Sequence, residues 1–535
     1  MDCTDAPTRR PRVRGLVAAA SLTVALATAA TALPAAAQSD EDAPPPTVSA
    51  VPIPAGQVDA AIAQLDGVAA DMLARTGVPG MAIAVVHRDR LMYAKGFGVR
   101  NTQTGAPVTP NTVFQLASVS KPVGATVVSR AVGEGVVSWD TRLIEHLPWF
   151  RLKSPSTTRQ VTLADMYSHR SGLPDHAGDL LEDLGYRRNQ VLRRLRYLPL
   201  HPFRAEYAYT NFGLTAAAEA VARAARTPWD RLSSRLLYEP LGMTSTSSRH
   251  ADYAAAPERA DLHVKEGDQW VPRFDRRPDP QSPAGGVSST LLDMAKWMRL
   301  MLAEGSYDGR QVVAAEPLAQ MSTPHILSNP PAVPAARSGF YGLGLNIGND
   351  WTARVRLNHS GAFALGAATV VNMLPAEELG IVVLTNGAPI GLPEAVAHTF
   401  LDLAETGRAE RDWLAAYGQA FAGLSEPAGR LAGQERPANP RPARRAAAYV
   451  GTYRNRYYGP ARVVRRGGGL AIRLGALREA LPLTHWSGDT FTYMPPGEMA
   501  SGISAVTFTR PRGGRPRAVT LENLDAEGLG TFRRR

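Results

Sequence analysis

The stretch Gln115-Leu-Ala-Ser-Val-Ser-Lys-Pro-Val-Gly-Ala-Thr126 decides how this chain is interpreted. At its centre, Ser118 and Lys121 are three residues apart, which places two side chains on one face of a helix. Pro122 fits the first turn of that helix, because the amide hydrogen that proline lacks has no intrahelical partner there. The mostly apolar run 122–132 predicts that the helix is buried. A buried, neutral lysine is a base that can activate a serine, although the pair alone also fits a capped helix start with an exposed lysine.

The composition is that of a globular protein with a basic balance. The chain has 535 residues, which predicts two or more folded units with tails, and a formal net charge of +11. Several arginines cluster at the two ends of the chain, and no basic motif is interleaved with aromatic residues, so we expect no nucleic-acid partner. Cys3 is the only cysteine, which excludes a disulfide framework, a cysteine nucleophile and a thiolate metal site from the mature chain.

Residues 1–37 have the features of a secretory signal peptide. Arginines precede an alanine-rich apolar stretch, and three alanines before Gln38 fit a cleavage site. We expect the mature protein to be secreted or periplasmic, with no stable membrane insertion after cleavage. Residues 38–56 are acidic and then proline-rich, which predicts a linker.

The segment 57–424 predicts one α+β domain. Residues 57–75 repeat apolar side chains at helical spacing, and a closing helix is expected at 392–404. Strand patterns lie near both ends of the segment, at 81–86, 91–97, 341–347, 355–359, 367–373 and 380–385. Helical patterns fill the middle. We therefore expect one sheet completed by both ends of the segment, flanked by helices and interrupted by a helical insert.

The remainder of the chain has a different period. Residues 425–446 are rich in Pro, Gly, Ala and Arg and predict a second linker. In residues 447–535, short strand patterns are separated by turn residues, at 449–453, 461–464, 470–474, 491–493, 505–509 and 518–521. This pattern predicts a small all-β, barrel-like domain.

Further short motifs follow one another along the chain. They are Ser168-His-Arg-Ser-Gly-Leu-Pro174, Tyr209-Thr-Asn211, Pro283-Ala-Gly-Gly286 and His359-Ser-Gly361. Together with Ser118-Val-Ser-Lys121, they resemble the serine β-lactamase-related superfamily, in particular the branch of class C β-lactamases, D-alanyl-D-alanine carboxypeptidases and secreted esterases. The resemblance covers roughly residues 57–406. Less specifically, residues 447–535 resemble the barrel-like domain appended to such hydrolases.

The resemblance implies a role for each residue of the first two motifs. Ser118 would be the acylated nucleophile, and Lys121 would help to accept its proton. Tyr209 would act as the partner base and then donate a proton to the leaving group. Asn211 would hydrogen-bond either the lysine or the acyl side chain of the substrate. Whether Lys121 or Tyr209 is the dominant base stays open, because coupled groups titrate as a pair.

The third motif would form the opposite wall of the site. His359, expected on an edge strand, would face Ser118. The backbone amides of Ser118 and Ala362 would form the oxyanion hole, which is the largest electrostatic contribution in acyl transfer. Gly361 would leave the substrate's approach to the strand open.

One departure from the family pattern bears on the substrate. β-Lactamases and penicillin-binding enzymes usually have a lysine where this chain has His359, and a histidine is largely neutral at pH 7. We therefore expect a secreted serine hydrolase of the esterase, D-aminopeptidase or carboxypeptidase type that acts through an acyl-enzyme on short esters or D-amino-acid amides and peptides. β-Lactam hydrolysis is an alternative. Another is a catalytically quiet protein of the same fold that binds the cell wall or a partner.

Neither a cofactor nor a metal is expected. His169, Asp175 and His176 lie close in sequence, but their spacing matches no known ligand pattern. The expected partner is a small ester, amide or peptidoglycan-like peptide substrate. The sequence leaves the oligomeric state open.

Overall fold

The computed structural model describes residues 47–49, 51–424, 426–498, 502–510 and 514–535. Residues from Val48 to Arg535 form one compact unit. The predicted signal peptide, residues 1–37, lies outside the described residues.

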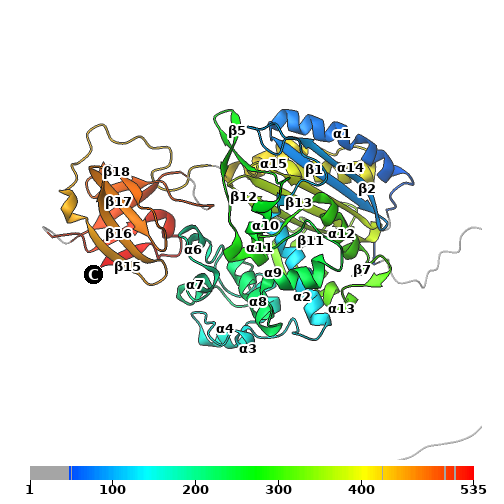
Figure 1. Ribbon diagram of the computed structural model, residues 1–535, viewed down its shortest axis with the longest axis horizontal. Helices are drawn as coiled ribbons and strands as arrows, with labels where there is room; N and C mark the ends of the chain where they lie inside the picture. Colours follow the sequence, from blue (N-terminus) through cyan, green and yellow to red (C-terminus); the bar gives the residue numbers. More distant parts are fainter. Residues whose placement is uncertain (1–46, 50, 425, 499–501, 511–513) are drawn as a thin grey trace, which may run out of the picture. The chain divides into compact units, whose positions relative to one another are not determined.

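An antiparallel sheet of eight strands forms the centre of the larger fold (Figure 1). In spatial order its strands are β2 (Arg90–Gly98), β1 (Gly80–His87), β14 (Leu379–Thr385), β13 (Ala367–Leu374), β12 (Val355–Phe363), β11 (Asn346–Asn349), β10 (Gly339–Tyr341) and β9 (Ile326–Asn329). Because β1 pairs with β14, strands from both ends of this segment complete one sheet. The predicted α+β class and the predicted closure of the sheet are confirmed.

The central strands are apolar on both faces because helices cover both sides. In β1, Met81, Ile83 and Val85 pack in one hydrophobic cluster with residues of α1 (Gln57–Thr76) and α14 (Leu392–Thr406). The alternate residues of the same strand pack in a second cluster with residues of α2 (Ser120–Gly133) and α12 (Leu291–Leu302). Side chains of a strand alternate between faces, so each face of the sheet has its own core.

The helical insert lies between β2 and the later strands (Figure 1). Its further helices are α3 (Leu143–His146), α4 (Pro155–Gln160), α5 (Leu163–Tyr167), α6 (Asp179–Asp183), α7 (Arg188–Leu192), α8 (Asn211–Ala224), α9 (Trp229–Ser233), α10 (His250–Ala255), α11 (Ser282–Gly285) and α13 (Ala315–Ala319). Short two-stranded sheets pair β3 (Phe114–Gln115) with β6 (Ser288–Ser289), β4 (Leu262–Glu266) with β5 (Gln269–Phe274), and β7 (Ser306–Tyr307) with β8 (Arg310–Gln311). After α14 comes α15 (Trp413–Phe421).

The C-terminal part of the chain is a closed barrel, which confirms the barrel-like prediction. Its strands are β15 (Gly451–Asn455), β16 (Gly459–Arg466), β17 (Gly469–Leu474), β18 (Leu481–Ser487), β19 (Thr490–Tyr493), β20 (Ser504–Thr509), β21 (Ala518–Leu521) and β22 (Thr531–Arg534). The sequence pattern did not predict β18, which contains Pro482, or the basic β22. Pairing of β22 with β15 closes the barrel and leaves no free edge.

The single strand predicted at 341–347 is wrong. The chain instead forms a hairpin, in which β10 ends at Tyr341 and β11 begins at Asn346. Gly344 adopts a φ of +82° between them, a conformation that glycine reaches without steric cost. The run of alternating glycines and apolar residues therefore encodes a turn, and the turn places Tyr341 beside the predicted catalytic residues.

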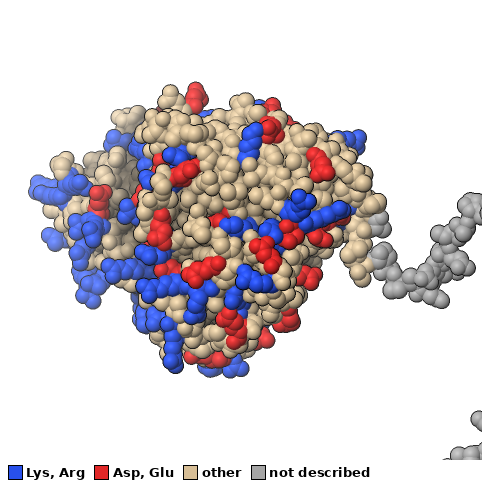
Figure 2. Space-filling view, turned by 45° about the vertical axis from the view of Figure 1, so that its right-hand side comes forward, with Lys and Arg blue, Asp and Glu red and all other residues tan. Residues whose placement is uncertain are grey.

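Charged side chains of both signs cover the surface. On the face shown in Figure 2, Asp and Glu lie among Lys and Arg, and Lys and Arg predominate toward its left-hand edge. In the described part of the chain, no helix has the length and apolar character needed to cross a bilayer. Nor does a group of three or more His, Cys, Asp or Glu side chains among those residues come together as a possible metal site.

Candidate active site

Ser118 lies in a tight turn at the start of α2. Ala117 has a φ of +46°, a left-handed conformation that costs a non-glycine residue about 1 kcal/mol or more. A single turn of 3₁₀ helix spans Ala117–Val119, and α2 begins at Ser120, two residues later than the sequence predicts. Ser118 is partly exposed although its neighbours are buried. The strained turn thus presents one hydroxyl to the site from a packed segment.

Lys121 is completely buried and contacts only neutral hydrogen-bond acceptors. Its ammonium group donates to Ser118 Oγ at 2.9 Å, to Asn211 Oδ1 at 2.7 Å and to the Ala284 carbonyl at 3.0 Å. Burial lowers the pKa of Lys121 to about 7, against a smaller opposing effect of Asp179. The structure therefore holds Lys121 against the predicted nucleophile, with a pKa that makes the neutral amine accessible near pH 7.

Tyr209 closes the same corner. Lys121 Nζ lies 4.4 Å from the centre of its ring, and Ser118 lies close enough to its hydroxyl to act on its pKa. Desolvation raises the pKa of Tyr209 well above its usual value, and Ser118 opposes this only in part. Tyr209 is consequently a phenol at neutral pH, a proton donor rather than a phenolate base.

Asn211 contacts Lys121, and its contact with the acyl side chain of a substrate stays a prediction. Its Oδ1 accepts from Lys121, and its Nδ2 donates to Asp179 Oδ2 at 2.8 Å. The same carboxylate oxygen lies 2.9 Å from His176 Nδ1, and this hydrogen bond raises the pKa of His176. Asp179 is the first residue of α6 and is buried. It is a site residue that the sequence analysis missed, because no motif marks it.

His359 forms the opposite wall as a neutral ring. Its Nδ1 lies 2.7 Å from the Ser360 carbonyl, which can only accept, so Nδ1 carries the proton. Nε2 then accepts from the Tyr341 hydroxyl at 2.9 Å. Burial, followed by the charge of Lys121, lowers the pKa of His359 to about 3. Both ring nitrogens are occupied, so His359 offers no cation to a substrate carboxylate.

The prediction that His359 lies on an edge strand is wrong, although half of the strand behaves as an edge. Within the sheet, β12 lies between β11 and β13. Pairing with β11 ends at Asn358, whereas pairing with β13 continues from His359 to Phe363. The half of β12 that carries the third motif is therefore paired on one side only, because β11 is shorter than β12.

Gly361 brings this half strand against the nucleophile. A Cβ there would collide with the Leu116 carbonyl oxygen and Thr369 Oγ1, and would lie 3.0 Å from Ser118 N. Glycine is thus needed for close packing of β12 on the turn that carries Ser118, and its role in the substrate's approach stays a prediction. Ala362 follows and is exposed. Its amide, as the second oxyanion donor, stays a prediction.

Comparisons with known proteins agree with this geometry. Residues 59–406, more than half of the chain, match the family model described as Beta-lactamase. The chain belongs to the beta-lactamase family. Residues 435–531 match a second model, described as Domain of unknown function (DUF3471).

Curated relatives of this beta-lactamase-family hydrolase have different activities in their names. The Unguisins hydrolase ungD of Aspergillus violaceofuscus is 27% identical over 83% of this chain and 85% of its own length. Penicillin-binding protein 4 of Amycolatopsis lactamdurans is 28% identical over 58% of this chain and 81% of its own. Esterase EstB of Burkholderia gladioli is 27% identical over 43% of this chain and 59% of its own.

A solved structure shares the fold. The octameric penicillin-binding protein homologue from Pyrococcus abyssi superposes with a TM-score of 0.57 at 20% identity, covering 86% of this chain and 98% of that one. At this identity the match supports the α+β fold and carries nothing about substrate.

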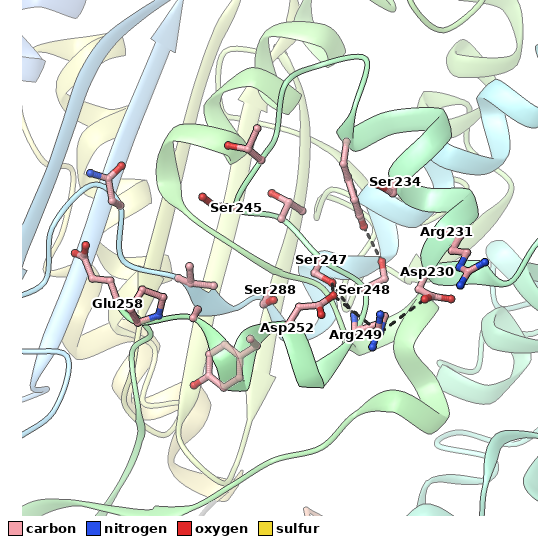
Figure 3. A pocket seen from close by; sticks show the side chains of 18 residues that line it. Asp230, Arg231, Ser234, Ser245, Ser247, Ser248, Arg249, Asp252, Glu258 and Ser288 are labelled. Atoms are coloured by element: carbon pink, nitrogen blue, oxygen red, sulfur yellow. Dashed lines mark hydrogen bonds and ion pairs between the residues drawn. The ribbon is translucent and has the colours of Figure 1, made fainter.

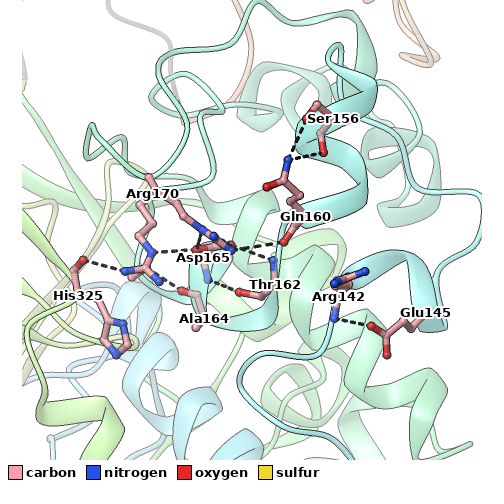
Figure 4. A network of polar contacts seen from close by, with 11 residues as sticks. Arg142, Glu145, Ser156, Gln160, Thr162, Ala164, Asp165, Arg170 and His325 are labelled. Carbon is pink, nitrogen blue, oxygen red and sulfur yellow. Dashed lines mark hydrogen bonds and ion pairs between the residues drawn. The ribbon is translucent and has the colours of Figure 1, made fainter. Parts of the chain in front are cut away.

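The family motif Ser168–Pro174 supports the back of the site. Asp165 is completely buried and accepts from Arg170 Nε at 2.8 Å and from Arg204 at 2.8 Å (Figure 4). Burial would raise the pKa of Asp165, but Arg204, the Thr162 amide and Arg170 outweigh it and hold the pKa below its usual value. The fixed carboxylate anchors the turn in which His169 takes a φ of +59°.

His169 then packs behind Tyr209. Its ring centre lies 4.7 Å from that of Tyr209 and 4.8 Å from that of Tyr341. Its Nδ1 accepts from the Thr210 amide at 3.1 Å. The sequence analysis considered His169 only as a possible metal ligand, and its contacts show that it holds the Tyr209 segment in place.

Two sizeable pockets lie away from this corner. One of about 590 Å³ is lined by polar residues that include Arg231, Ser247 and Arg249 (Figure 3), and one of about 640 Å³ adjoins it through Asp230 and Arg249. No predicted site residue lines either pocket. Arg249 lies between Asp230 at 3.8 Å and Asp252 at 4.0 Å, so its charge is already balanced. Neither pocket is therefore a better candidate for the reaction site than the surroundings of Ser118.

Proposed function

We propose that this protein is a secreted serine hydrolase that forms an acyl-enzyme on Ser118, with short esters or uncharged amides and peptides, including D-amino-acid ones, as substrates. The observation that carries the proposal is the contact of Ser118 Oγ with a buried lysine whose pKa lies at about 7. A serine becomes a useful nucleophile only when such a base adjoins it.

The reaction divides into two acyl transfers. Ser118 Oγ attacks the substrate carbonyl carbon while its proton passes to the neutral amine of Lys121. When the tetrahedral intermediate collapses, the bond to the leaving oxygen or nitrogen breaks, and Tyr209 donates its phenolic proton to that atom. The proton held by Lys121 then restores the phenol. Water then attacks the carbonyl carbon of the Ser118 ester while its proton passes to neutral Lys121. When this second intermediate collapses, the bond to Ser118 Oγ breaks, Lys121 returns the proton to that oxygen, and the acid is released.

The oxyanion donors would come from the turn and from the half strand beside it. Ser118 N lies next to Gly361, and Ala362 follows on the unpaired half of β12. Preorganised amides at these two places would stabilise the charge that develops on the carbonyl oxygen.

The environment of His359 supports uncharged substrates. Penicillins carry a carboxylate, and a neutral ring with both nitrogens occupied cannot provide an ionic anchor for it. The curated relatives include a protein named an esterase and one named a hydrolase, which is consistent with this range of acyl compounds. β-Lactam turnover is accordingly the slower alternative.

The test is the intact mass of the protein after incubation with a p-nitrophenyl acyl ester, a D-alanyl peptide thioester or a penicillin. We expect an acyl adduct and fast turnover with the ester or the thioester, and neither with Ser118→Ala. The exposed Ser156→Ala is the matched control and retains wild-type labelling.

Each other outcome has a distinct meaning. Fast turnover of penicillin alone would assign the protein to β-lactam hydrolysis. A folded wild-type protein that no probe acylates would overturn the catalytic proposal in favour of a binding protein of the same fold.

A further inference from the structure

The C-terminal barrel contacts the segment that carries Asp179. Directly after α6, the Tyr186 hydroxyl donates to the Tyr458 carbonyl at 2.9 Å, and the Ala476 amide donates to the Leu184 carbonyl at 3.1 Å. These contacts are close, because a Cβ on Gly475 would lie 2.8 Å from the Tyr186 ring. The barrel therefore packs on the hydrolase fold beside its catalytic corner.

A second contact places a barrel carboxylate in a buried ionic cluster. Arg276 Nη2 lies 2.7 Å from Glu182 Oε2, and Arg276 Nε lies 2.9 Å from Glu498 Oε1. The three side chains are 7%, 5% and 14% exposed, respectively. Separating one buried cation from either carboxylate would leave a buried charge without its partner, which is costly, so the cluster favours close contact between barrel and hydrolase.

The same cluster reaches the wall opposite Ser118. The backbone amides of Leu365 and Ala364, in the turn that follows β12, lie near the Glu498 carboxylate and act to lower its pKa, although burial outweighs them. The Arg276 guanidinium lies 4.9 Å from the ring centre of Phe363, the last residue of β12. On the other side, the Arg276 carbonyl accepts from Gln115 Nε2 at 2.9 Å. Arg276 thus contacts a residue near each predicted oxyanion donor: Gln115, three residues before Ser118, and Phe363, next to Ala362.

We infer that Glu498, a residue of the barrel, is a positioning residue for the reaction at Ser118. It touches no reacting atom. It holds Arg276 against Phe363 and faces the turn at Ala364 and Leu365, and through these contacts it sets the place of the Ala362 amide on the half of β12 that pairs with β13 alone. This inference rests on the proposed function, since Ala362 matters only if an oxyanion forms there.

The inference separates Glu498 from a residue that merely attaches the barrel. Tyr186 also bonds the barrel, but its partner is the Tyr458 carbonyl and no atom of the β12 turn. If the barrel served only as an attached module, losing either contact would have the same small effect on the chemistry.

The experiment compares four variants in the full-length protein: Glu498→Ala, Glu498→Gln, Tyr186→Phe and Glu479→Ala. Glu479 is an exposed barrel carboxylate and serves as the charge-matched control. The measurements are kcat and KM on a p-nitrophenyl ester, the rate of Ser118 labelling by a fluorophosphonate, and Tm.

We expect Glu498→Ala to lower kcat and the labelling rate about tenfold, with KM within about twofold of wild type, because loss of oxyanion geometry weakens only transition-state binding. Glu498→Gln retains one acceptor oxygen and recovers part of the rate. Tyr186→Phe and Glu479→Ala keep wild-type kcat.

Wild-type kcat in Glu498→Ala would overturn the inference, and so would an equal loss in Tyr186→Phe. If Glu498→Ala does not fold, the isosteric Glu498→Gln decides, and unchanged kcat in that variant refutes the positioning role. A wild-type protein that neither turns over the ester nor reacts with the fluorophosphonate would overturn the proposed function itself, which these variants alone cannot do.

Discussion

Two buried cations in this protein have opposite surroundings. Lys121 contacts a hydroxyl, an amide oxygen and a carbonyl, whereas Arg276 lies between the carboxylates of Glu182 and Glu498. Burial consequently lowers the pKa of Lys121 to about 7. For Arg276, the neighbouring carboxylates outweigh burial and raise the pKa above its usual value. A cation without a compensating anion becomes a base, and one between two anions becomes a fixed support.

The largest expected effect comes from removing the uncompensated cation. Lys121→Met should lower kcat/KM on a neutral ester about 10³-fold, as for the loss of a general base, while the exposed Lys265→Met has no effect. In the wild type, kcat/KM should rise with pH through about 7 as the lysine loses its proton, and then level off. A pH profile that stays flat from 5.5 to 8.5 would show that Lys121 is not the base.

A smaller effect is expected from Asp179, which acts on Lys121 from a distance. Its charge favours protonated Lys121, so Asp179→Asn should move the rise in kcat/KM to lower pH. The change also disturbs the Asn211 amide, and we expect about a tenfold loss in the plateau rate. Asp175→Asn, an exposed neighbour, is the control. A rise that moves to higher pH would contradict this electrostatic account.

The smallest effect should follow a change within the compensated pair. Arg276→Lys keeps the charge, but one ammonium cannot match the guanidinium's planar contacts with two carboxylates. We expect about a threefold lower kcat and about 1–2 kcal/mol less stability in a urea titration. Arg277→Lys, whose side chain is 73% exposed, should match wild type in both assays. If Arg276→Lys also has wild-type kcat and stability, the buried cluster of Arg276, Glu182 and Glu498 contributes neither to catalysis nor to stability.

The meeting of Ser118, Lys121, Tyr209 and Asn211 could be predicted from sequence because these residues lie in short motifs. Ser118 and Lys121 share one turn of chain, and Tyr209 and Asn211 are two residues apart. Asp179 and Tyr341 could not be found in this way. Neither residue belongs to a recognised sequence motif, and only tertiary packing brings it to the site. Glu498 lies farther still, in a separate β domain, and its role depends on how that barrel packs.

In the sheet too, local features could be predicted from sequence, whereas features that depend on distant residues could not. Alternation of apolar residues located most strands, since the period of side chains along a strand is a local property. Whether β12 lies at an edge depends instead on where its neighbour β11 begins. The turn at Gly344 delays that beginning to Asn346, but the local sequence pattern there predicts a strand. How far a strand is paired depends on the length of the neighbouring strand. That neighbour can be distant in sequence, so the strand's own residues do not reveal it.

The burial of Lys121 also makes the folding of this protein a proton-releasing reaction at alkaline pH. In the unfolded chain the amine keeps a pKa near its ordinary value of 10.5, whereas in the folded chain the pKa is about 7. Between these two values the unfolded state binds more protons, so the fold gains stability from this group as the pH rises, and part of that gain is lost toward pH 7 and below. Lys121, the group that would make Ser118 reactive, thus makes the free energy of unfolding depend on the pH at which the protein folds.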